Sequence, residues 1–378
     1  MIIRLTPVSA LKIFFTTQAI GLSLWLLRIP EVKTTIGLSL IDLSFALFMQ
    51  PLGMLFGFFL ASSVIKLIGN KKSCLYFGPI FILSFVFVPF ANNFLFLATI
   101  LFLSGLICAT VEVSMNTIAA NLEKNFEKRM MSGFHAFWSF GALVSGIIVT
   151  SFSALSISFV TQQLSIIPPL MLVTIMISFS LPKDTSEPKP ITKLSRKAFV
   201  PSYSILLLCI MPFGALLLEG AMMEWTAVFK ANFHNINTTQ VGLIFCSFTI
   251  VMTLARFFGD QIADKLNIKR TIIFSMGLSS LGMLIFALNS SPIISILSAS
   301  LVGAGIANIY PITMSLVAAE AGIKERNVSL LAFISFTAFL ISAPLIGLLG
   351  ENFGLDKALA FIAPTSLLPI FYLYIAHK

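Results

Sequence analysis

Residues 94–121 read FLFLATILFLSGLICATVEVSMNTIAAN, a run of mostly apolar residues that contains one charged side chain, Glu112. About 20 apolar residues in a helix cross the roughly 30 Å hydrocarbon core of a bilayer, so this run predicts a transmembrane helix. Similar segments are predicted at 8–28, 42–65, 74–91, 130–153, 157–181, 202–226, 239–262, 271–289, 293–319, 328–350 and 357–376. With 57% hydrophobic and 10% charged residues, the composition excludes a soluble globular protein. The sequence predicts an all-α polytopic membrane protein with twelve transmembrane helices.

The positive charges predict how the chain is oriented. With the N-terminus in the cytoplasm, 19 of the 24 lysine and arginine residues fall on the cytoplasmic side. Four of the other five, Arg28, Lys33, Lys230 and Lys357, lie outside, and Arg256 lies within a span. This distribution follows the positive-inside rule and places both termini in the cytoplasm. The net charge of +9 therefore reflects orientation in a lipid bilayer and does not indicate a nucleic-acid partner.

A polar stretch divides the predicted spans six and six. Residues 182–200 contain three prolines and charges of both signs, which predict a cytoplasmic linker. The linker separates an amino-terminal bundle, residues 1–181, from a carboxyl-terminal bundle, residues 201–378.

Several features recur about 200 residues apart across this linker. Trp25 corresponds to Trp225, and Glu112 corresponds to Tyr310, each seven residues after a glycine. Parallel repeats of this kind are typical of transporters whose two bundles are related by an axis along the membrane normal. The solute then binds near the midplane, between the bundles.

Six spans, a basic linker and six more spans resemble the major facilitator superfamily over the whole chain. In that superfamily the loop after the second span of each half carries a pattern like G-x-x-x-D-R/K-x-G-x-R/K-R/K. The second half keeps much of it, as Asp260-Gln-Ile-Ala-Asp264-Lys265-Leu-Asn267-Ile-Lys269-Arg270. The first half keeps Gly69, Lys71 and Lys72, with Lys66 where the aspartate would be.

Local blocks resemble one bacterial branch, the inner-membrane transporters similar to YbjJ. They are Trp25-Leu-Leu-Arg28-Ile-Pro30, Glu112-Val-Ser-Met115-Asn116, Ser132-Gly-Phe-His135-Ala-Phe-Trp138-Ser139, Glu219-Gly220-Ala-Met-Met-Glu224-Trp225 and Arg256-Phe-Phe-Gly259-Asp260. The resemblance implies a multi-pass solute transporter of the bacterial inner membrane that works by alternating access, and it does not name the solute.

Five residues are the main candidates for proton coupling or solute binding. Glu112 and Asn116 lie four residues apart, which puts them on one helix face about 6 Å apart along the axis. His135 lies at a similar depth in the next, antiparallel helix, Tyr310 is the counterpart of Glu112, and Glu219 is a second carboxylate within a span. Ionisable residues inside a membrane are costly and usually face a cavity or a partner. The alternative is a buried polar network that only fixes packing.

Other polar and aromatic residues lie at plausible cavity depths with weaker support: Gln18, Arg28, Gln50, Trp138, Glu224, Trp225 and Asn308. Interfacial snorkelling explains Arg28 as well as anion binding does. Glu224 could reach interfacial water, and Trp225 could belong to an aromatic belt.

Arg256 and Asp260 lie four residues apart, near the cytoplasmic end of the eighth span. An intrahelical ion pair would reduce the cost of both charges. We expect Arg256 and Asp260 to have a structural or gating role, with Asp264 and Lys265 bracing the inward gate.

The sequence contains no P-loop and no hydrolase or metalloprotease motif, so we expect neither an enzyme nor an ATP-driven pump. The four cysteines have no metal-ligand spacing, and we expect neither metal nor cofactor. We therefore expect a monomeric secondary transporter for a small polar solute, coupled to protons, with sodium as the alternative ion. A drug or metabolite efflux antiporter is one competing function, and a membrane sensor or scaffold that transports nothing is another.

Overall fold

The computed structural model describes residues 5–128, 130–182, 203–319 and 324–368. Within these ranges the chain is helical and contains no strand. Eleven of its helices are long and apolar enough to cross a membrane. The predicted linker, 182–200, lies almost entirely outside the described residues, and the twelfth predicted span, 357–376, is described as far as Leu368. The prediction of an all-α polytopic fold is confirmed.

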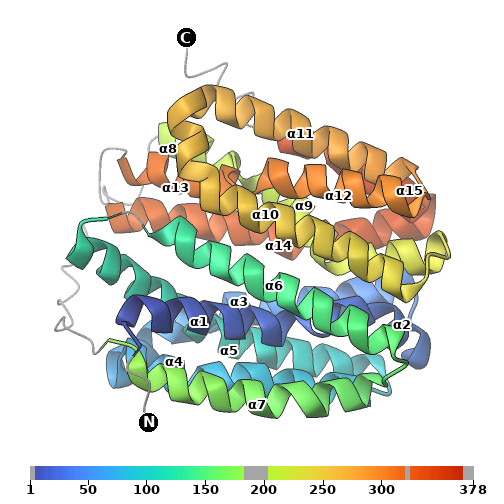
Figure 1. Cartoon of the computed structure of the whole chain (residues 1–378), viewed down its shortest axis with the longest axis horizontal. Coiled ribbons are helices and arrows are strands. Elements are labelled where there is room, and N and C mark those ends of the chain that lie inside the picture. The colour runs from blue at the N-terminus through green and yellow to red at the C-terminus, as the bar shows by residue number, and fades with distance from the viewer. Residues whose placement is uncertain (1–4, 129, 183–202, 320–323, 369–378) are drawn as a thin grey trace.

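The helices follow one another as long antiparallel spans (Figure 1). The amino-terminal half contains α1 (Pro7–Ser23), η1 (Leu26–Arg28), α2 (Ile29–Ile36), α3 (Leu40–Ile68), α4 (Asn70–Ser84), η2 (Phe85–Phe90), α5 (Phe94–Phe126), α6 (Met131–Ala154) and α7 (Phe159–Ser180). The carboxyl-terminal half contains α8 (Tyr203–Ile210), α9 (Phe213–Val228), η4 (Phe229–Phe233), α10 (Thr238–Leu266), α11 (Ile268–Leu288), α12 (Pro292–Ile306), α13 (Ile309–Ala319), α14 (Lys324–Phe353), α15 (Leu355–Ile362) and η5 (Ala363–Leu367).

Local sequence explains where most of these helices begin and end. Side chains of Ser39, Asn93 and Ser158 cap the helices that follow them by accepting backbone N–H groups. The span that carries Tyr310 is broken at Ala307–Asn308, between α12 and α13. That break lies just before Pro311, where the sequence predicts a bend.

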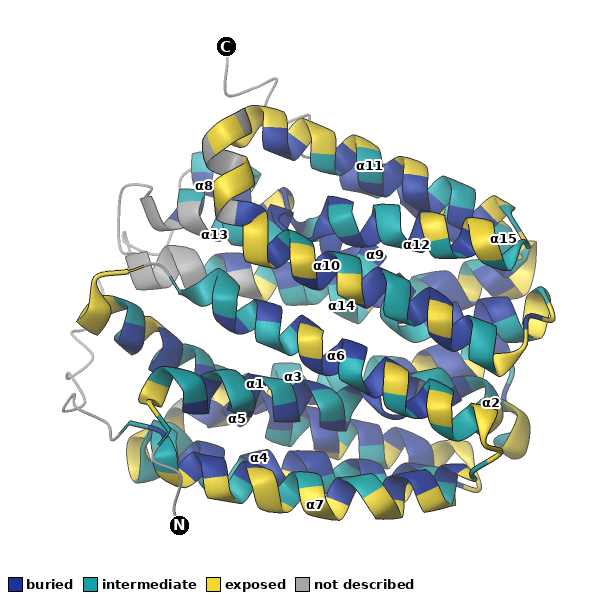
Figure 2. Ribbon diagram, in the orientation of Figure 1, coloured by how far each residue is buried: buried dark blue, intermediate teal, exposed yellow. Residues whose placement is uncertain are grey.

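The surface of the molecule exposes large apolar side chains, as the surface of a membrane protein does. Large apolar side chains such as Phe59, Leu95 and Met176 are 70% or more exposed. In Figure 2 exposed and buried positions alternate around the outermost helices, such as α7 and α11. An apolar exposed surface of this extent requires lipid around it, because water would strongly disfavour it.

Glycines bring equivalent helix pairs together within each half. Gly105 of α5 packs directly on the backbone of Gln50 in α3, and Gly303 of α12 packs on the backbone of Phe248 in α10. A side chain at either glycine would collide with that backbone, so small residues are needed there. The two halves thus repeat the same packing about 200 residues apart.

Two helix pairs join the halves: α3 packs against α14, and α6 packs against α10 (Figure 1). We call the end of the molecule that holds α2 and the first turn of α3 the outer end, following the orientation predicted from charge. At that end η1 and α2 of the first half also pack against α9 of the second. Gly347 of α14 lies against Ser44 of α3, and Gly242 of α10 lies against Thr150 of α6. The bundles are therefore in close contact at the outer end.

Candidate functional site

Glu112 and Asn116 form a linked pair on α5. The side-chain amide of Asn116 donates to Glu112 Oε1 at 2.8 Å and to the backbone carbonyl of Glu112 at 2.9 Å. Both residues are half-buried, and Glu112 lies within electrostatic range of the Tyr310 hydroxyl on α13. The structure thus brings this pair together with its predicted counterpart in the other bundle.

Arg256 on α10 makes contacts with three other helices or helix ends. Its Nη2 atom lies 3.1 Å from both carboxylate oxygens of Glu219 on α9. Nε donates to the carbonyl of Ala307, at the break between α12 and α13, at 3.3 Å. Nη1 donates to the hydroxyl of Ser139 on α6, in the other bundle. The side chain of Arg256 is 8% exposed and that of Glu219 is 14% exposed, so this is an ion pair inside the protein.

The structure describes the side chain of one other residue of the predicted gate, Lys265. The side chains of Asp260 and Asp264 lie outside the described residues, and Lys265 is exposed. The expected ion pair between Arg256 and Asp260 therefore stays a prediction. Glu219, which the sequence presents as a separate carboxylate, is the partner that the structure gives to Arg256.

His135 lies on α6 one turn before Ser139. Its ring meets the ring of Phe15 edge-on, with centroids 5.6 Å apart. It is half-buried and within electrostatic range of Arg256. Trp138, on the same helix, is half-buried and packs against the apolar core. His135 thus lies one turn from Ser139, the residue of α6 that bonds to Arg256, and no direct contact with Glu112 or Asn116 is seen among the described contacts.

Three of the weaker candidates, Gln18, Asn308 and Gln50, are buried or half-buried within the helices. Gln18 is buried, and its amide nitrogen lies close to Gly78 of α4, inside the amino-terminal bundle. Asn308 donates from Nδ2 to the carbonyl of Ala255 at 2.9 Å, which ties the break in its span to α10. Gln50 is half-buried on α3. The surroundings of Gln18 and Asn308 indicate packing roles.

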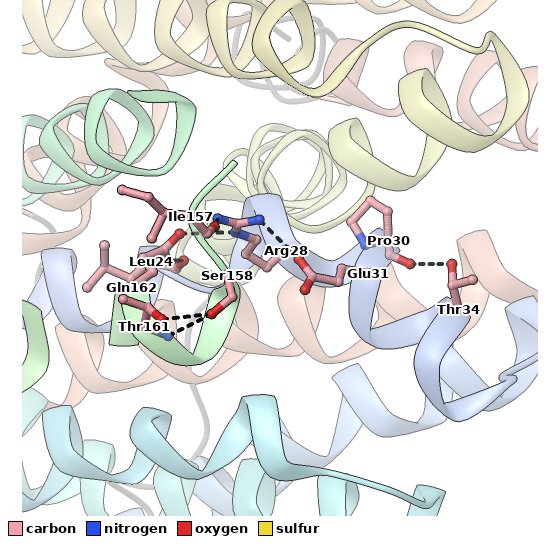
Figure 3. Close-up of polar contacts among 9 residues, drawn as sticks. All are labelled: Leu24, Arg28, Pro30, Glu31, Thr34, Ile157, Ser158, Thr161 and Gln162. Carbon is pink, nitrogen blue, oxygen red and sulfur yellow. Dashed lines mark hydrogen bonds and ion pairs between the residues drawn. The ribbon is translucent and has the colours of Figure 1, made fainter. Parts of the chain in front are cut away.

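Arg28 forms a closed network at the outer end of the amino-terminal bundle (Figure 3). It donates to the side chain of Gln162 at 3.0 Å, to Glu31 at 3.0 Å and to the carbonyl of Ile157 at 2.9 Å. Gln162 in turn donates to the carbonyl of Leu24. Arg28 is buried, and all of these partners belong to its own bundle, so the geometry favours neither snorkelling nor anion binding.

Trp225 is fully buried and Glu224, beside it on α9, is half-buried. Trp225 is therefore not part of a lipid-facing aromatic belt. The Oε2 atom of Glu224 is buried and has no hydrogen-bond partner among the described residues. This burial arises because α9 packs against η1 and α2 of the other bundle.

Lys230 is a buried cation that sequence reasoning assigned only to the outer side. Its ammonium donates to the carbonyls of Phe286 and Asn289 at 2.8 and 2.7 Å, and the rings of Phe229 and Phe286 flank it at 4.5 and 4.3 Å. His234 Nδ1 lies 3.3 Å away. His234 follows the span, and its pKa is lowered by partial burial and then by Lys230. The signal in the sequence was a lysine directly after an apolar run.

Among the described residues, no three His, Cys, Asp or Glu side chains converge to hold a metal. The candidate residues Glu112, Asn116, His135, Ser139, Glu219, Arg256 and Tyr310 supply carboxyl, amide, imidazole, hydroxyl, guanidinium and phenol groups. This set can exchange protons and form hydrogen bonds with a polar solute.

Comparisons with known proteins agree with this architecture. The family model described as Major Facilitator Superfamily matches residues 13–326 and 221–377. A transporter of the MFS type from Yersinia pestis is 25% identical over 93% of this chain and 91% of its own length. Membrane protein MosC from Rhizobium meliloti is 24% identical over 94% of this chain and 86% of its own length.

Solved structures are similar in fold. A D-xylose-proton symporter aligns with a TM-score of 0.79 and 13% identity, over 97% of this chain and 96% of the symporter. The nucleoside transporter NupG aligns with a TM-score of 0.75 and 14% identity, over 99% of this chain and all of NupG. At these identities the likeness concerns the fold alone.

Proposed function

Because the chain belongs to the major facilitator superfamily, we propose that this membrane transporter is a secondary active transporter of a small polar solute. It works by alternating access in the bacterial inner membrane, with both termini in the cytoplasm, and protons drive it. The observation that carries the proposal is a pair of intramembrane carboxylates, one in each bundle: Glu112 is hydrogen-bonded to Asn116 in the first bundle, and Glu219 is paired with Arg256 in the second.

The two carboxylates suit different tasks. Glu219 is neutralised by Arg256, so its charge is compensated inside the protein. Glu112 has the neutral amide of Asn116 as its hydrogen-bond partner and no cation bound to it among the described residues. Desolvation favours the neutral form of a carboxyl group. Glu112 is therefore the better proton carrier, while Glu219 and Arg256 form a charge pair whose geometry a solute or a proton could alter.

The solute is proposed to be polar because of the polar side chains that the two bundles carry within their spans. Asn116, Tyr310 and Glu112 offer both hydrogen-bond donors and acceptors. The solved structures that share this fold include a D-xylose-proton symporter and a nucleoside transporter, whose solutes are polar. Pentoses and nucleosides are accordingly the first solutes to test.

Proteoliposome flux tests this function. Purified protein is screened for thermal stabilisation by pentoses and nucleosides, because a ligand that binds the folded state raises its stability. The stabilising solute is then offered to proteoliposomes with an imposed pH gradient. Glu112→Gln is expected to abolish proton-driven accumulation and to leave counterflow exchange intact. Glu127→Gln, at an exposed glutamate just beyond the same helix, is the matched control and should transport normally.

Two results would overturn parts of the proposal. Unaltered driven uptake by Glu112→Gln would remove Glu112 from the coupling role. Binding of a solute without flux under any imposed pH or sodium gradient would replace the transporter by a sensor.

A further inference from the structure

A hydrogen bond at the outer end links a side chain of one bundle to the backbone of the other. The Oε2 atom of Glu351, in the last turn of α14, accepts the backbone N–H of Leu40 at 3.0 Å. Leu40 is the first residue of α3, so its N–H has no partner within that helix. Glu351 therefore caps a helix of the opposite bundle.

The helix α3 already carries a cap of its own. Ser39 and Asp42 form a reciprocal capping box, in which the Ser39 hydroxyl accepts the N–H of Asp42 and the Asp42 carboxylate accepts the N–H of Ser39. This local cap satisfies two N–H groups and leaves that of Leu40 to Glu351. The structure of α3 is thus specified without Glu351, and the additional bond acts between the bundles.

The bond depends on close contact of the two helices. Gly347, one turn before Glu351, lies so close to Ser44 that a side chain at Gly347 would overlap it. A methyl group at Gly350 would lie 3.5 Å from the Leu40 side chain. A hydrogen bond weakens steeply once donor and acceptor move beyond about 3.5 Å. Any separation of the outer ends of α3 and α14 therefore breaks it.

We propose that Glu351 is an outer latch, a carboxylate that stabilises the arrangement closed at the outer end and that must release Leu40 before this end opens. A carboxylate suits this task because the N-terminus of a helix carries partial positive charge. The proposal rests on the alternating-access part of the proposed function and assigns the residue that biases it.

Hydrogen–deuterium exchange of the purified protein in lipid nanodiscs tests the latch without solute or ion gradient. Three variants are compared with the parent: Glu351→Ala, Glu351→Gln and the control Asn352→Ala. Asn352 is exposed beside Glu351 and donates only to the carbonyl of Leu348 in its own helix. Peptides covering 36–46 and 345–356 report on the outer end, and a peptide covering 117–128 reports on the inner end of α5.

Glu351→Ala is expected to raise exchange in both outer peptides about fivefold, the typical effect of losing a helix cap. Exchange at 117–128 should fall in the same sample, because opening one end closes the other. Glu351→Gln keeps an acceptor and loses the charge, so its increase should be about twofold. Asn352→Ala should match the parent.

Faster exchange at 36–46 alone, with 345–356 and 117–128 unchanged, would mean a purely local cap and would overturn the latch. No change in any peptide would overturn it as well. Failure of the flux experiment with Glu112→Gln would leave this result standing, since exchange is measured without transport.

Discussion

Removing the charge of Glu219 is the sharpest test of the site's energetics. Glu219→Gln leaves the Arg256 guanidinium in place with its side chain 8% exposed and no carboxylate at 3.1 Å. Removing one partner of a buried ion pair typically destabilises a protein by about 3–5 kcal/mol, because the other charge stays buried. Arg256 keeps its hydrogen bonds to Ser139 and to the carbonyl of Ala307, which reduces the loss. We therefore expect a loss of about 3 kcal/mol, at the lower end of that range.

A second variant separates the cost of the orphaned charge from the value of the pair. In Glu219→Gln combined with Arg256→Gln neither charge remains, so no unpaired charge stays buried. The double variant should therefore be more stable than Glu219→Gln alone. The free energy of unfolding is measured by denaturant titration in detergent micelles. The parent, Glu219→Gln, Arg256→Gln and the double variant form a double-mutant cycle.

An ion pair whose carboxylate is exposed provides the matched control. Glu31 bonds to Arg28 at 3.0 Å, but its side chain is 47% exposed. Glu31→Gln should cost about 1 kcal/mol or less, because the Glu31 carboxylate is solvated and Arg28 keeps its hydrogen bonds to Gln162 and to the carbonyl of Ile157. The reasoning is refuted if Glu219→Gln costs no more than Glu31→Gln, or if the double variant loses the sum of its two single losses.

Two further predictions concern packing and pH. Gly105→Ala should destabilise the protein by about 1–3 kcal/mol in the same titration, since the new methyl group meets the Gln50 backbone. Gly277→Ala is the control, because nothing lies within 4 Å of the added methyl group, and it should have no such cost. Equal losses in the two variants would contradict the packing argument. The pKa of His234 is lower in the folded protein than its ordinary value, so between these two values the unfolded chain binds the proton more readily and stability is lost as pH falls. The midpoint temperature of thermal unfolding should therefore fall more between pH 7.5 and pH 5.5 in the parent than in His234→Gln. Equal falls in the two proteins would show that His234 does not contribute to the pH dependence of stability.

The sequence predicts those parts of the site that depend on local spacing or on the repeat. Glu112 and Asn116 share a helix face because they are one turn apart, and their bond is what that spacing allows. Tyr310 lies near Glu112 because the two halves repeat the same glycine contacts, which puts equivalent residues at the same depth. The positions of the helices follow from apolar segments long enough to span a bilayer.

The parts that depend on how separate helices pack could not be predicted in the same way. The local spacing predicts Asp260 as the ion-pair partner of Arg256. The contact of Arg256 with Glu219 arises because α9 and α10 lie side by side. Tryptophan is common at membrane interfaces, yet Trp225 is buried because the opposite bundle packs against its helix. The bond of Glu351 to Leu40 joins residues 311 positions apart and has no sequence pattern, because a backbone N–H is the donor.

The glycine contacts of α3 with α5, and of α10 with α12, make each pair of helices move together as a stiff lever. The 29 residues of α3 are roughly 43 Å long at 1.5 Å per residue. Rotation of such a rod by about 10° around its midpoint displaces each tip by about 4 Å. That displacement exceeds the reach of a hydrogen bond, so a modest tilt that leaves every intrahelical bond intact is sufficient to exchange one set of contacts at the ends for another. In the proposed transport cycle, the small residues where the helices cross would therefore convert a slight motion near the solute into a complete loss of contact at the ends of the helices.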